Sequence, residues 1–340
     1  MPLAIDFPSW IHPEIFPFLP KLPLRWYGLM YLVAFGITYL LFKRQVRTRK
    51  LGFSDDTVAG FFLAAILGLI LGARLFGTLL YDPTGEYWRQ PWLIFWPFAD
   101  GGQFIGFRGM SFHGGLVGVV AGTVLYAKRY KLDYLAWADM MAVSVPLGYT
   151  FGRLGNFINA ELWGKVSTAP WAMVFPGAQR FPASQAWVQD VMEKTGMAAT
   201  QAMVNLPRHP SQLYEALFEG VLLWLFLWFT VRKRSPFKGF AVGAYVAGYG
   251  LVRFVIEYFR EPDADMGYII KLGDPAASIH LYSTPWNFSM GQILCVLMIV
   301  GGLGFIWIRS KAARRENSLL AAAQAERAAI DLGRKRLKKR

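Results

Sequence analysis

Long apolar stretches recur along this 340-residue chain and are separated by shorter polar segments. A helix needs about 20 apolar residues to cross the hydrocarbon core of a bilayer. Seven stretches approach or exceed this length, and the third is the shortest. They are Trp26–Phe42, Val58–Tyr81, Gly114–Ala127, Leu135–Gly152, Leu213–Val231, Phe240–Ile256 and Phe288–Ile308. The pattern predicts an all-α polytopic membrane protein with seven transmembrane helices.

Two segments do not fit this pattern of spans. The first 25 residues are interrupted by prolines and lack the basic start of a cleavable signal, so we interpret them as an interfacial arm. The segment from about 160 to 210 is too polar to span a membrane and too long for a turn, and it predicts a small extracytoplasmic cap. The predicted organisation is a transmembrane domain over 1–308, with the cap as an insertion, and a basic cytoplasmic tail over 309–340.

The charges support this class and predict its orientation. Charged residues make up 17% of the chain, against about 25% in an average soluble domain, and hydrophobic residues make up 54%. The net charge is +14, and most Lys and Arg residues follow the first, third, fifth and seventh stretches. Because cytoplasmic segments carry the excess of basic residues, we expect the N-terminus outside and the C-terminus in the cytoplasm. An odd number of spans requires the same arrangement.

The remaining signals narrow the class of partner. The basic run Arg334–Arg340 also has a nucleic-acid interpretation, but attraction to anionic lipid explains it more simply, so we expect membrane lipids and no nucleic acid as partners. Cys295 is the single cysteine and lies inside the seventh stretch, which is typical of a core residue rather than a nucleophile. The four histidines are scattered and form no metal-binding pattern.

Polar side chains gather near the predicted outer boundary of the membrane. Charged groups at membrane depth are costly, so each is a candidate functional residue. The candidates are Tyr27 at the first stretch; His113 at the third; Arg153, Asn156, Asn159 and Glu161 at the fourth; and Tyr249, Arg253, Glu257 and Arg260 at the sixth. The last four are spaced by 4, 4 and 3 residues and therefore share one helical face. A transporter would be expected to concentrate its polar site nearer the midplane.

Most of these residues also have a purely structural interpretation. Arg253 and Glu257 can neutralise each other as an i,i+4 pair. Tyr27 can belong to the interfacial aromatic belt. His113 can mark a helix start beside a close helix contact at Gly114–Gly115.

Two further arginines differ in how easily a structural role explains them. Arg74 lies near the outer end of the second stretch, where snorkelling toward water accounts for it. Arg153 lies between Gly152 and Gly155, where the backbone can approach a ligand closely, and a structural role explains it least well.

The segments around these candidates resemble the bacterial prolipoprotein diacylglyceryl transferase family. Gly152–Gly164, with the sequence GRLGNFINAELWG, resembles the signature of that family. Trp26–Tyr31, Met110–Gly115, Tyr249–Arg260 and His209–Glu215 are similar to further family motifs. The matches leave only the basic tail uncovered.

One stretch departs from the family pattern. The family usually has a Trp, an acidic residue and two glycines before the Met-Ser-Phe-His sequence that ends at His113. Here that stretch is Gly106–Gly109, with an Arg in place of one glycine. The departure concerns the geometry of this loop and leaves His113 itself in place.

The resemblance implies a transferase of the bacterial inner membrane whose active site faces the outer leaflet. Such an enzyme moves the diacylglyceryl group of phosphatidylglycerol to the lipobox cysteine of a preprolipoprotein signal peptide. The product carries a thioether, and glycerol 1-phosphate is released. The nucleophile belongs to the substrate, and no metal or organic cofactor is required.

Physical reasoning assigns roles that agree with this chemistry. Arginine offers paired donors to a phosphate, so Arg153 and Arg253 are candidates to bind the headgroup and to stabilise the departing phosphate. His113 is the candidate general base for the thiol. The other predicted contacts are Asn156, Asn159 and Tyr249 to the headgroup, Tyr27 to the substrate, Glu161 and Glu257 to the arginines, and Gly155 and Gly164 as points of close backbone approach.

Two other classes of protein remain as alternatives. A lipid or anion transporter would use outward-facing arginines to attract its substrate. A membrane scaffold would use the aromatic cap to bind partners. A transferase alone would convert a lipobox peptide to a lipidated thioether, so that product separates the three.

Overall fold

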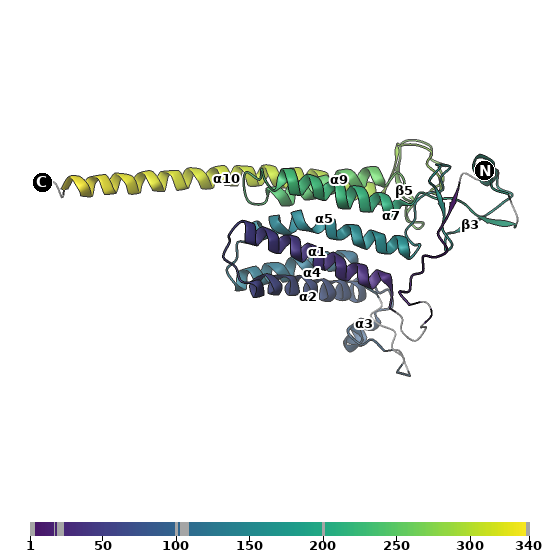
Figure 1. Ribbon diagram of the computed structural model, residues 1–340, viewed down its shortest axis with the longest axis horizontal. Helices are drawn as coiled ribbons and strands as arrows, with labels where there is room; N and C mark the ends of the chain where they lie inside the picture. The colour runs from purple at the N-terminus through teal and green to yellow at the C-terminus, as the bar shows by residue number, and fades with distance from the viewer. Residues whose placement is uncertain are drawn as a thin grey trace. The chain divides into compact units, whose positions relative to one another are not determined.

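The computed structural model describes residues 4–16, 18, 24–98, 101–102, 109–198 and 201–337 (Figure 1). The chain forms two compact units, one of Met1–Thr38 with Ala138–Arg340 and one of Tyr39–Trp137, and each is described by itself. Most of the departure from the family pattern, residues 106–108, lies outside the described residues.

Each predicted apolar stretch coincides with helical structure. The helices are α1 (Trp26–Thr48), α2 (Asp55–Leu79), α4 (Phe112–Arg129), α5 (Tyr134–Ile158), the helical run Ser211–Val231, α9 (Phe240–Ile256) and α10 (Met290–Leu337). Among the described residues, four helices are long and apolar enough to cross a membrane: Trp26–Thr48, Asp55–Leu79, Ser211–Val231 and Met290–Ala325. α9 is apolar but has only 17 residues. The chain is thus a mostly helical membrane protein.

The helical run Ser211–Val231 is irregular. It consists of α7 (Ser211–Tyr214), π-helical η2 (Glu215–Leu222), α8 (Leu223–Phe226) and π-helical η3 (Leu227–Val231). π-Helical turns are rare and are frequent at functional sites. Two carboxylates, Glu215 and Glu219, lie in η2 and are buried.

The prediction of an all-α chain is wrong outside these long helices, because the structure also contains short strands. They form three two-stranded sheets, and β1–β2 is parallel while the other two are antiparallel. The strands are β1 (Ile5–Asp6), β2 (Met173–Val174), β3 (Arg180–Pro182), β4 (Met203–Asn205), β5 (Tyr268–Lys271) and β6 (Asn287–Ser289).

A small folded region, here called the head, is built from the described residues of 4–16, 160–210 and 258–289. Its core packs Val188 and Val191 of α6 (Ala186–Thr195) against Phe181, Val204 and Leu206. Leu281 packs against this core from the third segment, and β1 pairs with β2 from the first. The segment predicted as a cap therefore folds around a hydrophobic core, but it recruits two distant segments to do so.

In the unit Tyr39–Trp137, α2 packs closely against α4 along a line of glycines. A Cβ at Gly118 would overlap the carbonyl oxygen of Gly68 and lie 2.9 Å from the Cα of Gly72. Gly114 likewise faces the carbonyl oxygen of Gly72 and the side chain of Phe76. Small residues let membrane helices approach to backbone contact, so this line of glycines holds the helix pair together.

We expect Gly118→Ala to destabilise the protein by about 1–3 kcal/mol, because the new methyl group has to push two packed backbones apart. Gly36→Ala in α1 is the matched control, since nothing lies within 4 Å of a Cβ there. Thermal unfolding in detergent compares the two variants. Equal melting temperatures for both would contradict close packing at Gly118.

Arg74 on α2 is buried rather than directed toward water. Its guanidinium donates hydrogen bonds to the carbonyl oxygen of Leu93, at 3.0 Å, and to that of Ile94. These acceptors belong to the 3₁₀ helix η1 (Pro91–Ile94), which follows the short helix α3 (Glu86–Arg89). The prediction that Arg74 snorkels toward water is therefore wrong. Its hydrogen bonds instead link α2 to η1.

α10 packs against α9 and continues far beyond the seventh predicted stretch. Gly243 and Gly250 of α9 face α10, where a Cβ would come within 2.9 Å of the carbonyl oxygens of Gly302 and Cys295, respectively. α10 has 48 residues, which corresponds to about 72 Å at 1.5 Å per residue. The helix therefore passes through position 308 without interruption. Figure 1 shows α10 as one continuous ribbon that becomes yellow toward the C-terminus.

Candidate active site

The unit that contains the head also contains a compact cluster of arginines and glutamates. Glu215, at the start of η2, is 0% exposed and lies at its centre. Its Oε2 is 2.8 Å from Nε of Arg153 on α5 and 3.3 Å from Nη1 of Arg253 on α9. Its Oε1 is 2.6 Å from Nη1 of Arg260, just after α9. One buried carboxylate thus joins three arginines from two separate segments.

Two further carboxylates complete the charge balance. Oε1 of Glu219 is 3.4 Å from Nη1 of Arg253. Oε1 of Glu257 is 2.6 Å from Nη2 of Arg253 and 3.4 Å from Nε of Arg260. Buried ions are stable only when they are paired and hydrogen-bonded, and here three cations face three anions. The cluster is a preorganised, electrically balanced site.

Arg153 is held in place but keeps an unused donor. Its Nε donates to the hydroxyl of Tyr149 at 2.6 Å, and its guanidinium lies over the ring of that tyrosine, 4.8 Å from the ring centroid. Its Nη1 donates to Oδ1 of Asn156 at 3.4 Å. Tyr149 in turn donates to Glu219. Within the described part of the chain, Nη2 of Arg153 has no hydrogen-bond partner, so an incoming anion can bind there.

An amide-rich branch extends from Arg153 toward the end of α5. Nδ2 of Asn156 donates to Oε1 of Glu161 at 2.8 Å, and Nδ2 of Asn159 donates to the same oxygen at 3.4 Å. Glu161 was predicted to hold an arginine, but among the described residues its carboxylate accepts hydrogen bonds from these two asparagines. It therefore orients the amides, while Glu257 does pair with arginines as predicted.

The predicted glycines allow close packing within the protein itself. A Cβ at Gly155 would lie 3.2 Å from the ring of Tyr27, which places α1 against α5 one turn from the cluster. A Cβ at Gly164 would overlap the carbonyl oxygen of Phe259 and lie 3.0 Å from Cβ of His209. The backbone approach predicted at these glycines is thus to neighbouring segments of the chain.

The predicted aromatic residues lie next to the cluster. The hydroxyl groups of Tyr27 and Tyr31 are 3.0 Å apart. The ring of Tyr249 on α9 packs edge-on against that of Tyr149, with 6.0 Å between the centroids. Together with the contacts above, the structure brings the predicted site residues other than His113 into one region of this unit: Tyr27, Arg153, Gly155, Asn156, Asn159, Glu161, Gly164, Tyr249, Arg253, Glu257 and Arg260.

The remaining predicted residue, His113, belongs to the other unit. It lies in the first turn of α4, whose N-terminus is capped by Ser111 through a 3.1 Å hydrogen bond from the amide of Gly114. The structural interpretation of a helix start beside a close helix contact is confirmed, because Gly114 packs on α2. The His113 side chain is exposed.

Three members of the cluster are missing from the predicted set: Tyr149, Glu215 and Glu219. Both glutamates lie inside the fifth apolar stretch, four residues apart, and they carry charge where the surrounding residues are apolar. The rule that marks intramembrane charges as functional applies to them directly. Tyr149 carries no such signal, since a tyrosine in an apolar helix is common.

The head also contains basic side chains that are buried or half-buried, namely Lys165, Arg208 and His209. Nζ of Lys165 donates to the carbonyl oxygen of Tyr258 at 3.0 Å, and burial lowers the pKa of Lys165 to about 8. Burial and the nearby Lys165 charge lower the pKa of His209 to about 4, so its imidazole is neutral near pH 7. Nη1 of Arg208 donates to the carbonyl oxygen of Gly164 at 3.2 Å and pairs with Glu261. Among the described residues, no group of three or more His, Cys, Asp or Glu side chains could hold a metal ion.

Known proteins resemble this sequence over most of its length. The family model for prolipoprotein diacylglyceryl transferase matches residues 13–308. A phosphatidylglycerol–prolipoprotein diacylglyceryl transferase of Treponema denticola is 53% identical over 325 residues, which cover 91% of this chain and 95% of that protein. Transferases of the same name from Treponema pallidum and Chlorobaculum tepidum are 47% and 42% identical, over 93% and 91% of this chain and 98% and 96% of their own length. The chain belongs to the prolipoprotein diacylglyceryl transferase family.

Proposed function

We propose that this chain transfers the diacylglyceryl group of phosphatidylglycerol to the lipobox cysteine of a prolipoprotein. The relatives are named for these two substrates. The observation that carries the proposal is Arg153, whose Nε is held by Glu215 and Tyr149 while Nη2 stays available. A fixed guanidinium with an unused donor suits the anionic phosphate of the lipid.

The reaction makes one bond and breaks one. The cysteine sulfur bonds to the terminal glyceryl carbon, and the bond from that carbon to the phosphate oxygen breaks. Its electron pair leaves with the phosphate, so glycerol 1-phosphate departs and a thioether remains. The thiol proton passes to a base, because the thiolate is the nucleophile and a free thiol has a pKa of about 8.5.

We assign the residue roles from the contacts within the charged cluster. Arg153 and Arg253 bind the phosphate and stabilise the negative charge that grows on it as the bond breaks. Glu215 and Glu257 keep both guanidinium groups in position. Asn156, together with Asn159, Tyr27 and Tyr249, binds the glycerol headgroup, and His113 accepts the thiol proton.

The membrane arrangement belongs to the same proposal. Seven helices cross the bacterial inner membrane, with the N-terminus outside and the C-terminal part of α10 in the cytoplasm. The head covers the site at the outer leaflet, where the exported prolipoprotein arrives. The distribution of basic residues supports this orientation.

Purified protein incubated with labelled phosphatidylglycerol and a lipobox peptide tests the function. A transferase yields a lipidated peptide with a thioether and releases glycerol 1-phosphate. A transporter would move the lipid without changing it, and a scaffold would bind the peptide without forming product. Absence of the lipidated peptide under conditions where both substrates bind would refute the proposal.

His113→Gln tests the general base. We expect the rate to fall by about 10²–10⁴-fold, which is the usual contribution of general acid–base catalysis. The rise of activity with pH should also change, since the thiol then has to ionise without help. A variant with the wild-type rate and pH profile would remove His113 from the mechanism. Because the His113 side chain is exposed, we do not expect glutamine at this position to disturb folding. Thermal unfolding of the variant checks this point.

A further inference from the structure

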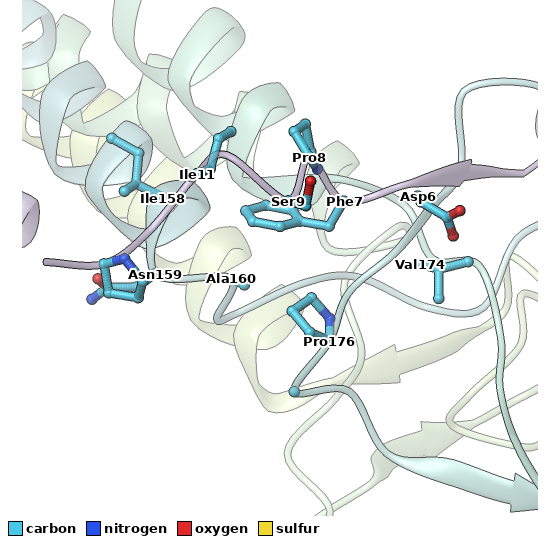
Figure 2. A pocket seen from close by; sticks show the side chains of 12 residues that line it. Asp6, Phe7, Pro8, Ser9, Ile11, Ile158, Asn159, Ala160, Val174 and Pro176 are labelled. Atoms are coloured by element: carbon cyan, nitrogen blue, oxygen red, sulfur yellow. The ribbon is translucent and has the colours of Figure 1, made fainter. Parts of the chain in front are cut away.

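A cavity lies between the N-terminal arm and the end of α5. It has a volume of about 440 Å³. The arm lines it from Asp6 to Pro13, and Asn159 lies at its wall. Figure 2 shows Asn159 and Asp6 toward opposite ends of this pocket, with Phe7 and Ser9 between them. The arm follows the edge of the pocket and includes a turn at Ser9 and Trp10.

The chemistry of the lining disfavours a lipid phosphate. Asp6 is the single charged side chain among the described residues that line the pocket, and its charge repels an anion. Most of the other lining side chains are apolar, including Phe7, Ile11 and Ile158. The pocket therefore suits a chain with apolar side groups and hydrogen-bond donors.

Asn159 adds an acceptor without a partner. Its Nδ2 donates to Glu161, which fixes the orientation of the amide. Its Oδ1 is buried and has no hydrogen-bond partner in the described part of the chain. Buried acceptors are rarely left unpaired, so this oxygen is suited to receive an N–H group from a bound molecule.

A chain of hydrogen bonds connects Asn159, at the wall of the pocket, to Arg153 of the proposed catalytic site. Asn159 and Asn156 both donate to Oε1 of Glu161, and Asn156 accepts from Arg153. A molecule bound along the arm therefore ends next to the groups that would bind the phosphate. Peptides are recognised in this way, by extended backbone with donors and by apolar contacts for the side chains.

We infer that this pocket binds the residues of the prolipoprotein that directly follow the acceptor cysteine. The inference rests on the proposed function, because that function supplies both the cysteine and the outward position of the segment after it. The apolar part of the signal peptide stays between membrane helices, while the exported part lies along Asp6–Pro13. Asp6 then favours a basic residue shortly after the cysteine over an acidic one.

Gly177→Trp tests the pocket directly. Gly177 lines the cavity, nothing lies within 4 Å of a Cβ built there, and its backbone does not require glycine, so the indole fills open space. We expect the KM for a lipobox peptide to rise by about tenfold or more, while the KM for phosphatidylglycerol changes less than about twofold. Gly301→Trp on α10 is the matched control, since it adds the same bulk at another open position.

A binding measurement separates this inference from the proposed function. The probe is a fluorescent lipobox peptide with Cys replaced by Ser, which cannot be lipidated. Weaker binding to Gly177→Trp than to wild type supports the inference even if no transfer occurs. Equal binding overturns it, even if wild type is an active transferase. A rise in the KM for phosphatidylglycerol alone would assign the pocket to the lipid and also overturn it.

Asp6→Lys provides a second variant if the indole disturbs folding, because Asp6 is exposed. We expect the KM of a peptide with Lys after the cysteine to rise by up to about fivefold and that of a peptide with Glu to fall, as for an exposed ion pair. Equal changes in the KM of both peptides would contradict a role for Asp6 in selecting the charge of the residue after the cysteine.

Discussion

Arg153→Ala is expected to lower kcat/KM for phosphatidylglycerol by about 10²–10³-fold, which is the loss seen when one preorganised donor to a developing anion is removed. The structure gives the reason. Arg153 is positioned by Tyr149, Glu215 and Asn156, so its remaining donor is oriented before the lipid arrives. Steady-state transfer to a lipobox peptide, at varied lipid concentration, measures the loss.

The fold should tolerate this change. Glu215 keeps Arg253 and Arg260 as partners, so it is not left as an unpaired buried anion. Arg153→Lys should recover little activity. A single ammonium group cannot bind the protein partners of Arg153 and the phosphate at the same time, as the planar guanidinium can. Arg180→Ala removes an exposed arginine of the head and serves as the control. Wild-type activity in Arg153→Ala would remove the phosphate-binding role.

Glu215→Ala is expected to cost about 3–5 kcal/mol of stability, as for removal of one partner from a buried ion network. Arg253 and Arg260 would keep Glu219 and Glu257 as partners, but Arg153 would lose its ion pair with Glu215 and its charge would be uncompensated. Activity should also fall sharply, because Arg153 and Arg253 would lose their common anchor. Unfolding in detergent, followed by helical circular dichroism, measures the free energy of unfolding.

A compensated double variant separates charge balance from other effects. Glu215→Gln with Arg260→Met removes one anion and one cation, and we expect it to be more stable than Glu215→Gln alone. Glu193→Ala on the exposed face of α6 is the control and should change stability by less than about 0.5 kcal/mol. A Glu215→Ala protein as stable as wild type would contradict the central position of this carboxylate.

The long helices were predictable because a bilayer requires long apolar runs. All seven predicted stretches coincide with helical structure, and the errors are at the ends. α1 continues to Thr48 and α10 to Leu337, since a helix does not need to stop where the apolar residues stop. Hydropathy marks the region suited to lipid and carries little information on where the backbone changes conformation.

The head and the centre of the site were less predictable. Strands of two to four residues, such as β1 or β3, are too short to show an alternating pattern, and their partners are far away in sequence. The candidate arginines were visible because they flank glycines or follow one helical face. Glu215 is missing from the predicted site because it lies within an apolar run. A carboxylate inside a membrane-spanning stretch is nevertheless a strong signal of a functional residue.

The head joins segments that are far apart in the sequence, so the order in which they are synthesised limits when it can fold. Ile5 pairs with Met173, and the amide of Val166 donates a hydrogen bond to the carbonyl oxygen of His280. Contacts between such distant segments form slowly and late, since a long loop has to close first. The helices up to α9 can therefore form before the head is complete. We expect the head to reach its final fold only after residues 258–289, which follow α9, have been synthesised.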